Sequence, residues 1–208
     1  NRTYDGTADA TGVSSITNSS DFNLNGNSLT VGSASFNDKT AANGKPVTLD
    51  SVGAGNDNIS LAGTITDTAD ITKATLTATL AANDKVYDGT VTATGTLSDN
   101  SFSGDNLSIN ETGIAFADKN AATGKTVTAS GLNLTGTDAS NYTLASTSVT
   151  DTADITAKTL TATLAADNKV YDGTVSATGT LSDDRIGSDI LSLNPDSFTF
   201  GDANAATG

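Results

Sequence analysis

The chain contains no cysteine, histidine, methionine or tryptophan among its 208 residues. Without cysteine it can form no disulfide and has no thiol nucleophile. Without histidine it lacks the commonest general base, metal ligand and pH switch. These absences argue against an enzyme, and the sequence predicts no catalytic, cofactor-binding or metal-binding residue.

Positive charge is scarce, because 10 lysines and arginines face 24 acidic residues, for a net charge of −14. Nucleic acids and anionic membranes bind basic patches, so neither is expected as a partner, and we predict no direct membrane insertion in this segment. An acidic surface attracts cations instead, so bound structural calcium is the alternative to a chain without a cofactor. Aspartates in turn-like contexts with asparagine and glycine are its candidate ligands: Asp99, Asp105, Asp118 and Asp138.

Neither the calcium-loop pattern D-x-[DN]-x-[DN]-G nor the glycine-rich nonapeptide occurs in the chain. The capping of turns is therefore the favoured role of these aspartates.

The six residues KVYDGT stand at 85–90 and again at 169–174, and RTYDGT stands at 2–7. The tyrosines are 83 and 84 residues apart, a period that suits a small complete domain rather than a solenoid coil. The sequence therefore predicts tandem repeats. The three predicted domains are residues 1–72, which lack the first strand of the repeat, residues 73–156, which are complete, and residues 157–208, which are an N-terminal half.

The second and third repeats are close relatives. Residues 75–124 and 159–208 align without a gap and share 33 of 50 residues. Most differences fall in one variable block (residues 100–117 and 184–201), where apolar positions persist and polar positions drift. This pattern is typical of a domain that keeps its apolar core while its polar surface varies.

Short alternating segments predict strands. In TLTATL (75–80), Leu76, Ala78 and Leu80 share one face. The Asp-Gly pair of each YDG motif predicts a turn with positive φ, after which Val91, Ala93 and Leu97 are expected to point inward along a strand over residues 90–97.

About eight strands are readable in each 84-residue repeat, and no segment shows helical periodicity beyond a turn at 118–124. We therefore predict an all-β chain of small antiparallel β-sandwich domains arranged end to end.

Where one repeat passes into the next, the sequences ITKATLTATL (71–80) and ITAKTLTATL (155–164) contain neither glycine nor proline. Flexible linkers are rich in glycine and serine, so a stiff connection between the repeats is expected. The partners predicted here are neighbouring repeats, with strand exchange between chains of a fibre as a further prediction for the incomplete ends.

The repeated tyrosine and aspartate have two interpretations: a glycan-binding or catalytic pair, or a half-buried tyrosine that anchors a strand end beside an Asp-Gly turn. The second is favoured, because the motif recurs once per domain and no histidine can serve as a base. The acidic pairs at residues 67 and 70, and at 151 and 154, would lie on opposite faces of a strand, which argues against a glycosidase.

Lys85 and Asn141 form the obvious pair for an intramolecular isopeptide bond. Arg2 replaces the lysine in the first repeat, and a guanidinium cannot form that bond. A crosslink in every repeat is therefore not expected.

The order of KVYDGT, FADKNAATGKTVT, GLNLTGTDASNYTL and TADITAKTLTATL resembles the YDG and MBG-type repeats of very large bacterial surface proteins, including filamentous-haemagglutinin-like adhesins. The likeness covers essentially the whole chain. Departures from the pattern are Arg2 for lysine, Ile59 for Tyr142 and Ala203 for Lys119, which indicates that these side chains are replaceable.

The resemblance implies a secreted, tandemly repeated all-β stalk at a bacterial cell surface or in an extracellular matrix, with no catalytic residues. It also implies domains of either an immunoglobulin-like or a β-grasp-like topology, and the strand pattern favours the immunoglobulin-like one. The expected function is that of a stiff spacer for adhesion or biofilm. The alternative is an adhesive module that binds glycans or another surface through the variable block, including Phe102 and Phe116.

Overall fold

The computed structural model describes residues 1–10, 29–31, 33–49, 52–54, 65–187 and 189–206. Strands dominate these residues, and their single helix is a 3₁₀ turn, η1 (Ala139–Asn141). The all-β prediction is confirmed. The prediction of a helical turn at 118–124 is wrong. The backbone N–H of Asn120 donates to the Asp118 carboxylate at 2.8 Å, and strand β13 begins at Ala122. Within the same residues, no helix has the length and apolarity to cross a membrane.

The chain divides into two compact units, each assembled from three segments of the sequence. The first comprises Asn1–Ala81, Gly95–Ile114 and Thr128–Asp151, and the second comprises Ala82–Thr94, Ala115–Val127 and Thr152–Gly208. Each unit thus combines parts of two predicted repeats. The predicted domain boundaries stay a prediction, and residues 11–28 and 55–64 of the first domain lie outside the described residues.

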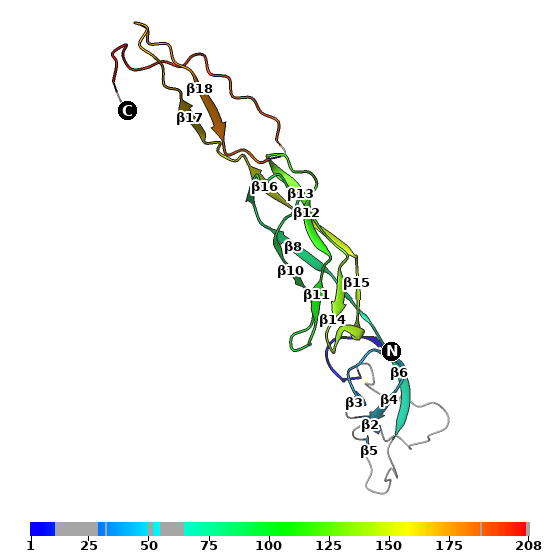
Figure 1. Cartoon of the computed structure of the whole chain (residues 1–208). Helices are drawn as coiled ribbons and strands as arrows, with labels where there is room; N and C mark the ends of the chain where they lie inside the picture. Colours follow the sequence, from blue (N-terminus) through cyan, green and yellow to red (C-terminus); the bar gives the residue numbers. More distant parts are fainter. Residues whose placement is uncertain (11–28, 32, 50–51, 55–64, 188, 207–208) are drawn as a thin grey trace. The chain divides into compact units, whose positions relative to one another are not determined.

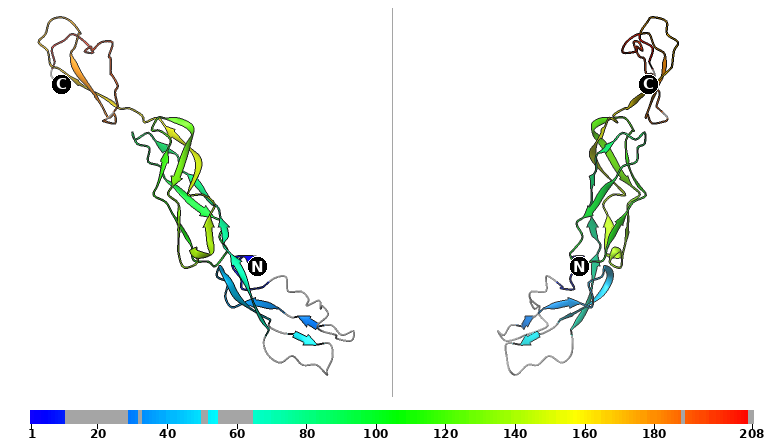
Figure 2. Two further views of the ribbon diagram at one scale, coloured as in Figure 1. Left: turned by 90° about the vertical axis from the view of Figure 1, so that its right-hand side faces the viewer. Right: turned by 60° about the vertical axis from the view of Figure 1, so that its left-hand side comes forward.

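A four-stranded sheet of the first unit, in the order β1-β6-β4-β3, carries the first YDG motif (Figure 1). The N-terminal strand β1 pairs in parallel with β6, with Arg2 opposite Ile71, and the two views in Figure 2 show the N-terminus beside this strand. Strand β4 is antiparallel to both of its neighbours. The strands of this sheet, with the separate β2–β5 pair, are β1 (Arg2–Thr3), β2 (Leu29–Val31), β3 (Ala34–Phe36), β4 (Ala42–Leu49), β5 (Val52–Ala54) and β6 (Thr66–Thr72).

The middle repeat supplies ten strands, which pair in both directions. Parallel pairs join β7 to β15 and β9 to β16, and β11 is antiparallel to β14. The purely antiparallel pairing expected from the sequence is therefore wrong. A sheet in the order β12-β13-β16-β9 and a β10-β8 pair complete this set. Its strands are β7 (Ala74–Leu76), β8 (Ala78–Ala82), β9 (Lys85–Val86), β10 (Gly95–Asp99), β11 (Ser108–Asn110), β12 (Gly113–Phe116), β13 (Ala122–Ser130), β14 (Asn133–Thr135), β15 (Tyr142–Leu144) and β16 (Ser148–Thr156).

The alternation in residues 75–80 is confirmed: Leu76 and Leu80 are buried and Ala78 is half-buried. The inward position expected for Val91 is wrong, since its side chain is exposed and β10 begins only at Gly95. The reason is local, because the Lys85 ammonium binds the backbone carbonyls of the turn that follows the YDG motif. Those carbonyls are consequently unavailable to a strand ladder.

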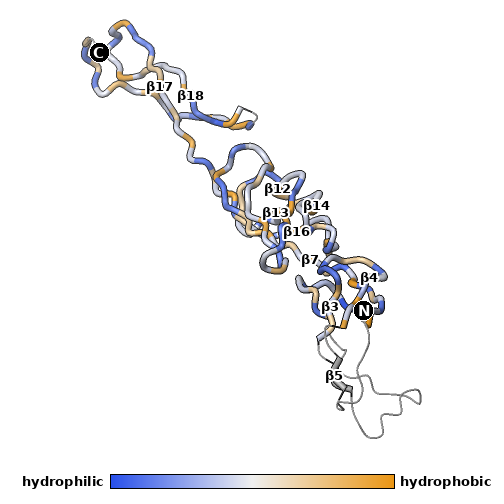
Figure 3. The backbone as a smooth tube through the Cα atoms, turned by 90° about the horizontal axis from the view of Figure 1, so that it is seen from below, coloured by the Kyte–Doolittle hydropathy of each residue, from blue (hydrophilic) through white to orange (hydrophobic). Residues whose placement is uncertain are grey.

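The core of the first unit joins two repeats. Its buried cluster takes three members from before residue 73 and three from after it: Tyr4, Phe36, Ile71, Ala74, Leu76 and Tyr142. Along the chain, hydrophobic residues come in short stretches interrupted by hydrophilic ones (Figure 3), as expected for strands with one face in a core. Because both repeats contribute, their junction is packed rather than hinged.

In the third repeat, β17 (Ala162–Ala166) pairs antiparallel with β18 (Gly179–Asp183). Among residues 157 to 206 that the structure describes, none is buried as a whole residue, although the side chain of Asp183 is 1% exposed.

Candidate functional site

The three YDG motifs form the same turn. Gly6, Gly89 and Gly173 have φ of 82°, 79° and 75°, in the left-handed region that favours glycine. The preceding aspartate accepts a hydrogen bond from the backbone N–H of the threonine two residues further on, at 2.8 to 2.9 Å in all three copies. The predicted Asp-Gly turn is therefore confirmed, and the aspartate serves the turn itself.

A cation closes each turn from the preceding strand. Lys85 donates to Asp88 and to the carbonyl of Thr90, both at 2.8 Å. Arg2 and Lys169 make the same contacts in their own repeats. The hydrogen bond from Lys85, followed by those from Thr90, lowers the pKa of Asp88 to about 2. The guanidinium of Arg2 takes the place of the ammonium because both groups donate several hydrogen bonds, although the Nε of Arg2 is buried without a partner.

Each of these cations also lies over a phenylalanine ring of its own repeat. The distances from the charged group to the ring centroid are 5.3 Å for Arg2 over Phe36 and 5.5 Å for Lys85 over Phe116, within the range of a cation–π interaction. Lys169 lies over Phe200 at 5.7 Å. In the second repeat, this contact ties the turn to β12, the strand at the end of the variable block.

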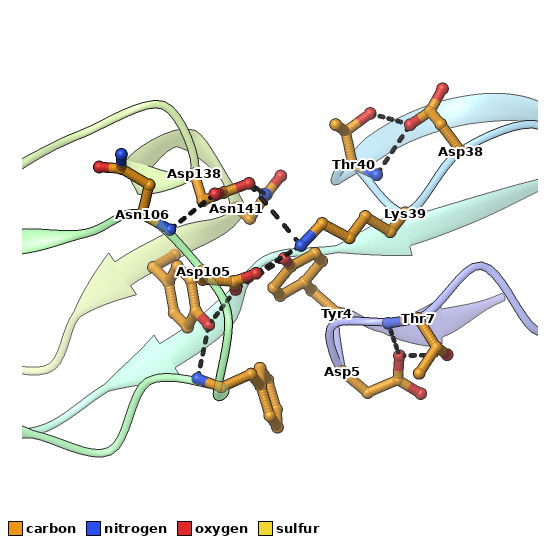
Figure 4. Close-up of polar contacts among 12 residues, drawn as sticks. Tyr4, Asp5, Thr7, Asp38, Lys39, Thr40, Asp105, Asn106, Asp138 and Asn141 are labelled. Carbon is orange, nitrogen blue, oxygen red and sulfur yellow. Dashed lines mark hydrogen bonds and ion pairs between the residues drawn. The ribbon is translucent and has the colours of Figure 1, made fainter.

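The tyrosine of the motif is directed differently, toward an aspartate of the following repeat. The hydroxyl of Tyr4 donates to Asp105 at 2.7 Å (Figure 4), and that of Tyr87 donates to Asp189 at 2.6 Å. The two aspartates are 84 residues apart in the sequence, so the contact is periodic. We call each such contact, with its lysine, a YDG joint: Tyr4, Lys39 and Asp105 in the first, and Tyr87, Lys119 and Asp189 in the second.

The lysine of each joint belongs to the same repeat as the tyrosine. Lys39 Nζ lies 2.5 Å from an oxygen of Asp105, and Figure 4 shows both side chains converging with Tyr4. In the second joint the Lys119–Asp189 distance is 3.8 Å. The carboxylate is 1% exposed in the first joint and 27% exposed in the second, so the first ion pair is the better shielded from water.

Residues near the end of the second repeat complete the first joint. The hydroxyl of Tyr142 donates to Asp105 at 2.6 Å and accepts the backbone N–H of Phe102 at 3.0 Å. The buried amide of Asn141 accepts the backbone N–H of Ala41 at 2.9 Å. The rings of Tyr4 and Tyr142 pack edge to face with centroids 5.3 Å apart. The buried carboxylate therefore has three donors, which offset much of the cost of removing its charge from water.

Burial and hydrogen bonding shift the ionisation of the first joint. Burial first, and then the hydrogen bond to Asp105, raise the pKa of Tyr142 to about 12. The same two causes raise the pKa of Tyr4. Burial acts to raise the pKa of Asp105, but hydrogen bonds from Lys39 and the two tyrosines outweigh it and leave that pKa below its ordinary value. The joint is thus built for a charged aspartate and neutral tyrosines.

The raised pKa of Tyr142 predicts a loss of stability in alkali. The folded state holds the hydroxyl proton more tightly than the unfolded state, so this contribution is complete below pH 10 and is lost as the pH approaches 12. We expect the free energy of unfolding to fall by about 2 to 3 kcal/mol over that window. Urea unfolding at pH 8 and pH 12 measures it.

The Tyr142→Phe variant should show a smaller fall, because its ring cannot titrate. Tyr171→Phe, at an exposed tyrosine, is the matched control and should behave like the wild type. Equal falls in all three proteins would contradict this account of the joint.

The four aspartates considered for calcium have other contacts in the structure. Asp99 accepts the backbone N–H of Ser101 at 2.8 Å, Asp118 pairs with Lys125 at 2.7 Å, and Asp138 accepts the backbone N–H of Asn106 at 2.8 Å. Asp105 is the acceptor of the joint. Over the part of the chain that the structure describes, no cluster of three or more acidic residues has metal-binding geometry.

The acidic residues of the TADIT segments serve the backbone. Asp70 accepts the N–H of Gly44 at 2.9 Å, and Asp154 accepts that of Gly124 at 2.7 Å. Lys85 and Asn141, the pair considered for an isopeptide bond, have the separate partners described above.

Sequence reasoning identified the tyrosine and the turn but assigned no role to Lys39 or Lys119. The signal was present, because the lysine recurs in FNDK and FADK and the aspartate recurs in the variable block. Nothing in the sequence joined two residues from different repeats. Ile59, which replaces Tyr142 in the first repeat, lies outside the described residues.

A family model described as YDG domain matches residues 71–149 and 156–208, which together exceed half of the chain. The matched stretches include the second joint and the Asp105 and Tyr142 side of the first. No curated protein and no solved structure matches the sequence.

Proposed function

Because the chain belongs to the YDG domain family, we propose that it is a structural repeat region of a secreted bacterial fibre or adhesin stalk, in which it serves as a stiff extracellular spacer. The observation that carries this proposal is the recurrence of the YDG joint at two successive repeat boundaries. A contact repeated with the period of the sequence serves the connection between repeats, whereas a ligand site needs no such period.

The first joint would resist separation. Opening it removes the two donors that the first repeat supplies, Tyr4 and Lys39, and leaves Asp105 only with Tyr142 of its own repeat. Hydrogen bonds to a charged group contribute about 1.5 to 3 kcal/mol each. In addition, Leu76 and Ile71, which lie on the two sides of the repeat boundary, are almost completely buried in one cluster. Polar and apolar contacts therefore act together to hold the boundary rigid.

The proposed location is the bacterial cell surface or an extracellular matrix, and the proposed partners are neighbouring repeats of the same protein. The absence of cysteine, the threonine-rich and acidic composition and the tandem repeats support this proposal. The adhesive site of such a fibre would lie outside the joints, since the polar groups of the joints bind one another.

Distance measurements by pulsed electron spin resonance test the stiffness of the second joint. The cysteine-free chain accepts two spin labels at exposed positions of the second compact unit, through Ala121→Cys in the second repeat and Asp196→Cys in the third. We expect one narrow distance distribution, and a broader one after Asp189→Ala. Asp202→Ala, at an exposed aspartate of the third repeat, should leave the distribution unchanged. A broad distribution in the otherwise unaltered chain would reject the spacer.

An adhesive function of the variable block is the second candidate, and it is favoured by one observation: Ile190 of the third repeat is fully exposed. Phe102 and Phe116 are poor probes of it, because Phe102 packs on Tyr4 and Phe116 is buried. A glycan array should therefore compare the chain with Ile190→Ser. Reproducible binding that this substitution abolishes would support adhesion, whereas a blank array is expected of a spacer.

A further inference from the structure

Three parallel strand pairs join an early strand of a repeat to a late strand of the same repeat. In the second repeat, β7 pairs with β15, and β9 pairs with β16, the last strand of that repeat. In the first repeat, β1 pairs with β6. We call these three the terminal pairs. Strands that are close to the two ends of a repeat thus run in the same direction, side by side.

Strand direction decides how tension along the chain acts on such a pair. When a repeat is pulled from both sides, the early strand is drawn from its N-terminal end and the late strand from its C-terminal end. In a parallel pair these two ends lie at opposite ends of the ladder, so the strands must slide past each other and their hydrogen bonds are loaded together. In an antiparallel pair the same two ends lie next to each other, and the bonds break one after another.

Further hydrogen bonds strengthen the terminal pairs. One backbone bond in each pair continues the ladder, with the N–H donor named first: Tyr4 to Thr72 and Tyr87 to Thr156, both at 2.8 Å, and Ala145 to Leu76 at 2.9 Å.

Two of the terminal pairs also have a side-chain latch, in which the late strand donates a backbone N–H to the residue just before the early strand. In the second repeat the N–H of Asp154 donates to the Asp84 carboxylate at 2.7 Å. In the first repeat the N–H of Asp70 donates to the side chain of Asn1 at 2.9 Å. The latch adds a bond that sliding of the strands must break.

One side of each terminal pair is closed to water. Ile71 of β6 and Ile155 of β16 are 1% exposed, and Leu76 of β7 is completely buried. Water that would replace a stretched hydrogen bond therefore cannot enter from that side, and a backbone group that loses its partner there stays unpaired at a cost.

We propose that the terminal pairs are load-bearing clamps, which let a repeat carry tension along the chain without unfolding. This function goes beyond that of a spacer, because the stiffness of a joint concerns bending between repeats, whereas a clamp resists pulling within one repeat. The proposal rests on strand direction and on hydrogen bonds inside each repeat. It does not depend on the YDG joints.

Single-molecule force spectroscopy on the whole chain tests the clamps of the second repeat. The chain has no cysteine, so handles can be attached through pairs of exposed positions. Lys73→Cys with Ala157→Cys pulls along the chain, so that β7 slides on β15 and β16 slides on β9. Lys73→Cys with Ser140→Cys pulls on the N-terminal ends of β7 and β15 and peels that pair. At one loading rate, we expect an unfolding force along the chain about twofold or more above the peeling force.

Equal forces in the two arrangements, or a lower force along the chain, would overturn the clamp. Equal forces beside a narrow spin-label distance distribution would reject the clamp and leave the spacer intact, so the two proposals can fail separately.

Removing the latch of the second repeat gives a second test. Asp84→Ala should lower the unfolding force along the chain and leave the peeling force unchanged, because Asp84 lies outside the peeled pair. Asp99→Ala, at an exposed aspartate that caps a local turn, is the matched control and should change neither force. An unchanged force along the chain after Asp84→Ala, or a fall of equal size in the control, would contradict a load-bearing clamp.

Discussion

Replacing Asp105 with alanine is expected to lower the free energy of unfolding of the first compact unit by about 3 to 5 kcal/mol, mainly because two buried hydroxyl groups lose their acceptor. The carboxylate is almost completely buried and accepts hydrogen bonds from Tyr4, Tyr142 and Lys39. Its removal leaves two tyrosine hydroxyls short of an acceptor and an ammonium without its nearest counter-charge. Few single surface substitutions reach this magnitude, so the result reports directly on the first joint.

Urea denaturation followed by tyrosine fluorescence measures this change, since the chain contains no tryptophan. Asp99→Ala is the matched control, because Asp99 is an exposed aspartate six residues earlier that caps a local turn. Its loss should cost about 1 kcal/mol or less. A cost for Asp105→Ala no greater than that of the control would show that the joint contributes nothing to stability.

Replacing Gly136 with alanine should destabilise the same unit by about 3 kcal/mol or more. Gly136 has a φ of +112°, and a Cβ built there would lie 2.3 Å from the carbonyl oxygen of Asn106. The backbone of Asn106 cannot move aside as a flexible side chain can, so the substitution combines conformational strain at residue 136 with a steric clash. Because Asn106 directly follows Asp105, the displacement would also disturb the first joint.

Gly44→Ala, in the same compact unit, separates the two contributions. Gly44 also has a positive φ, of +62°, but a Cβ there meets nothing within 4 Å. This variant should cost about 1 kcal/mol, the strain of a non-glycine residue in the left-handed region. Thermal unfolding of the two variants provides the comparison. Equal losses would mean that the close approach of Asn106 has no energetic consequence.

Much of the fold is predictable from local sequence, because strand faces and turns depend on near neighbours. The alternation of leucine and threonine indicated which side of residues 75–80 is buried, and the Asp-Gly pair indicated the positive φ of Gly89. Parallel pairing was missed, because β9 and β16 are separated by some 60 residues and no local pattern encodes strand direction. The position of Val91 was predicted wrongly, because Lys85 binds two backbone carbonyls in a segment that the alternation had assigned to a strand.

Only part of the joint could be predicted from the sequence, for the same reason. Tyr87 and Asp88 are adjacent in the sequence and suggested one shared role, but Asp88 closes the turn and Tyr87 reaches Asp189. Asp105 looked like one of several turn aspartates and a candidate calcium ligand. Its difference from Asp99 lies in its surroundings, since the Asp105 carboxylate is buried against the hydroxyls of Tyr4 and Tyr142 and Asp99 is exposed.

A tandem array of helix-poor repeats with a YDG turn in each can be predicted from the residues alone, because periodicity and turn chemistry depend on residues close together in the chain. That the tyrosine, lysine and aspartate of each joint come from two successive repeats could be learned only from the folded chain. The energy of that contact depends on burial and on distances between groups about 100 residues apart, and only the folded chain brings such groups together.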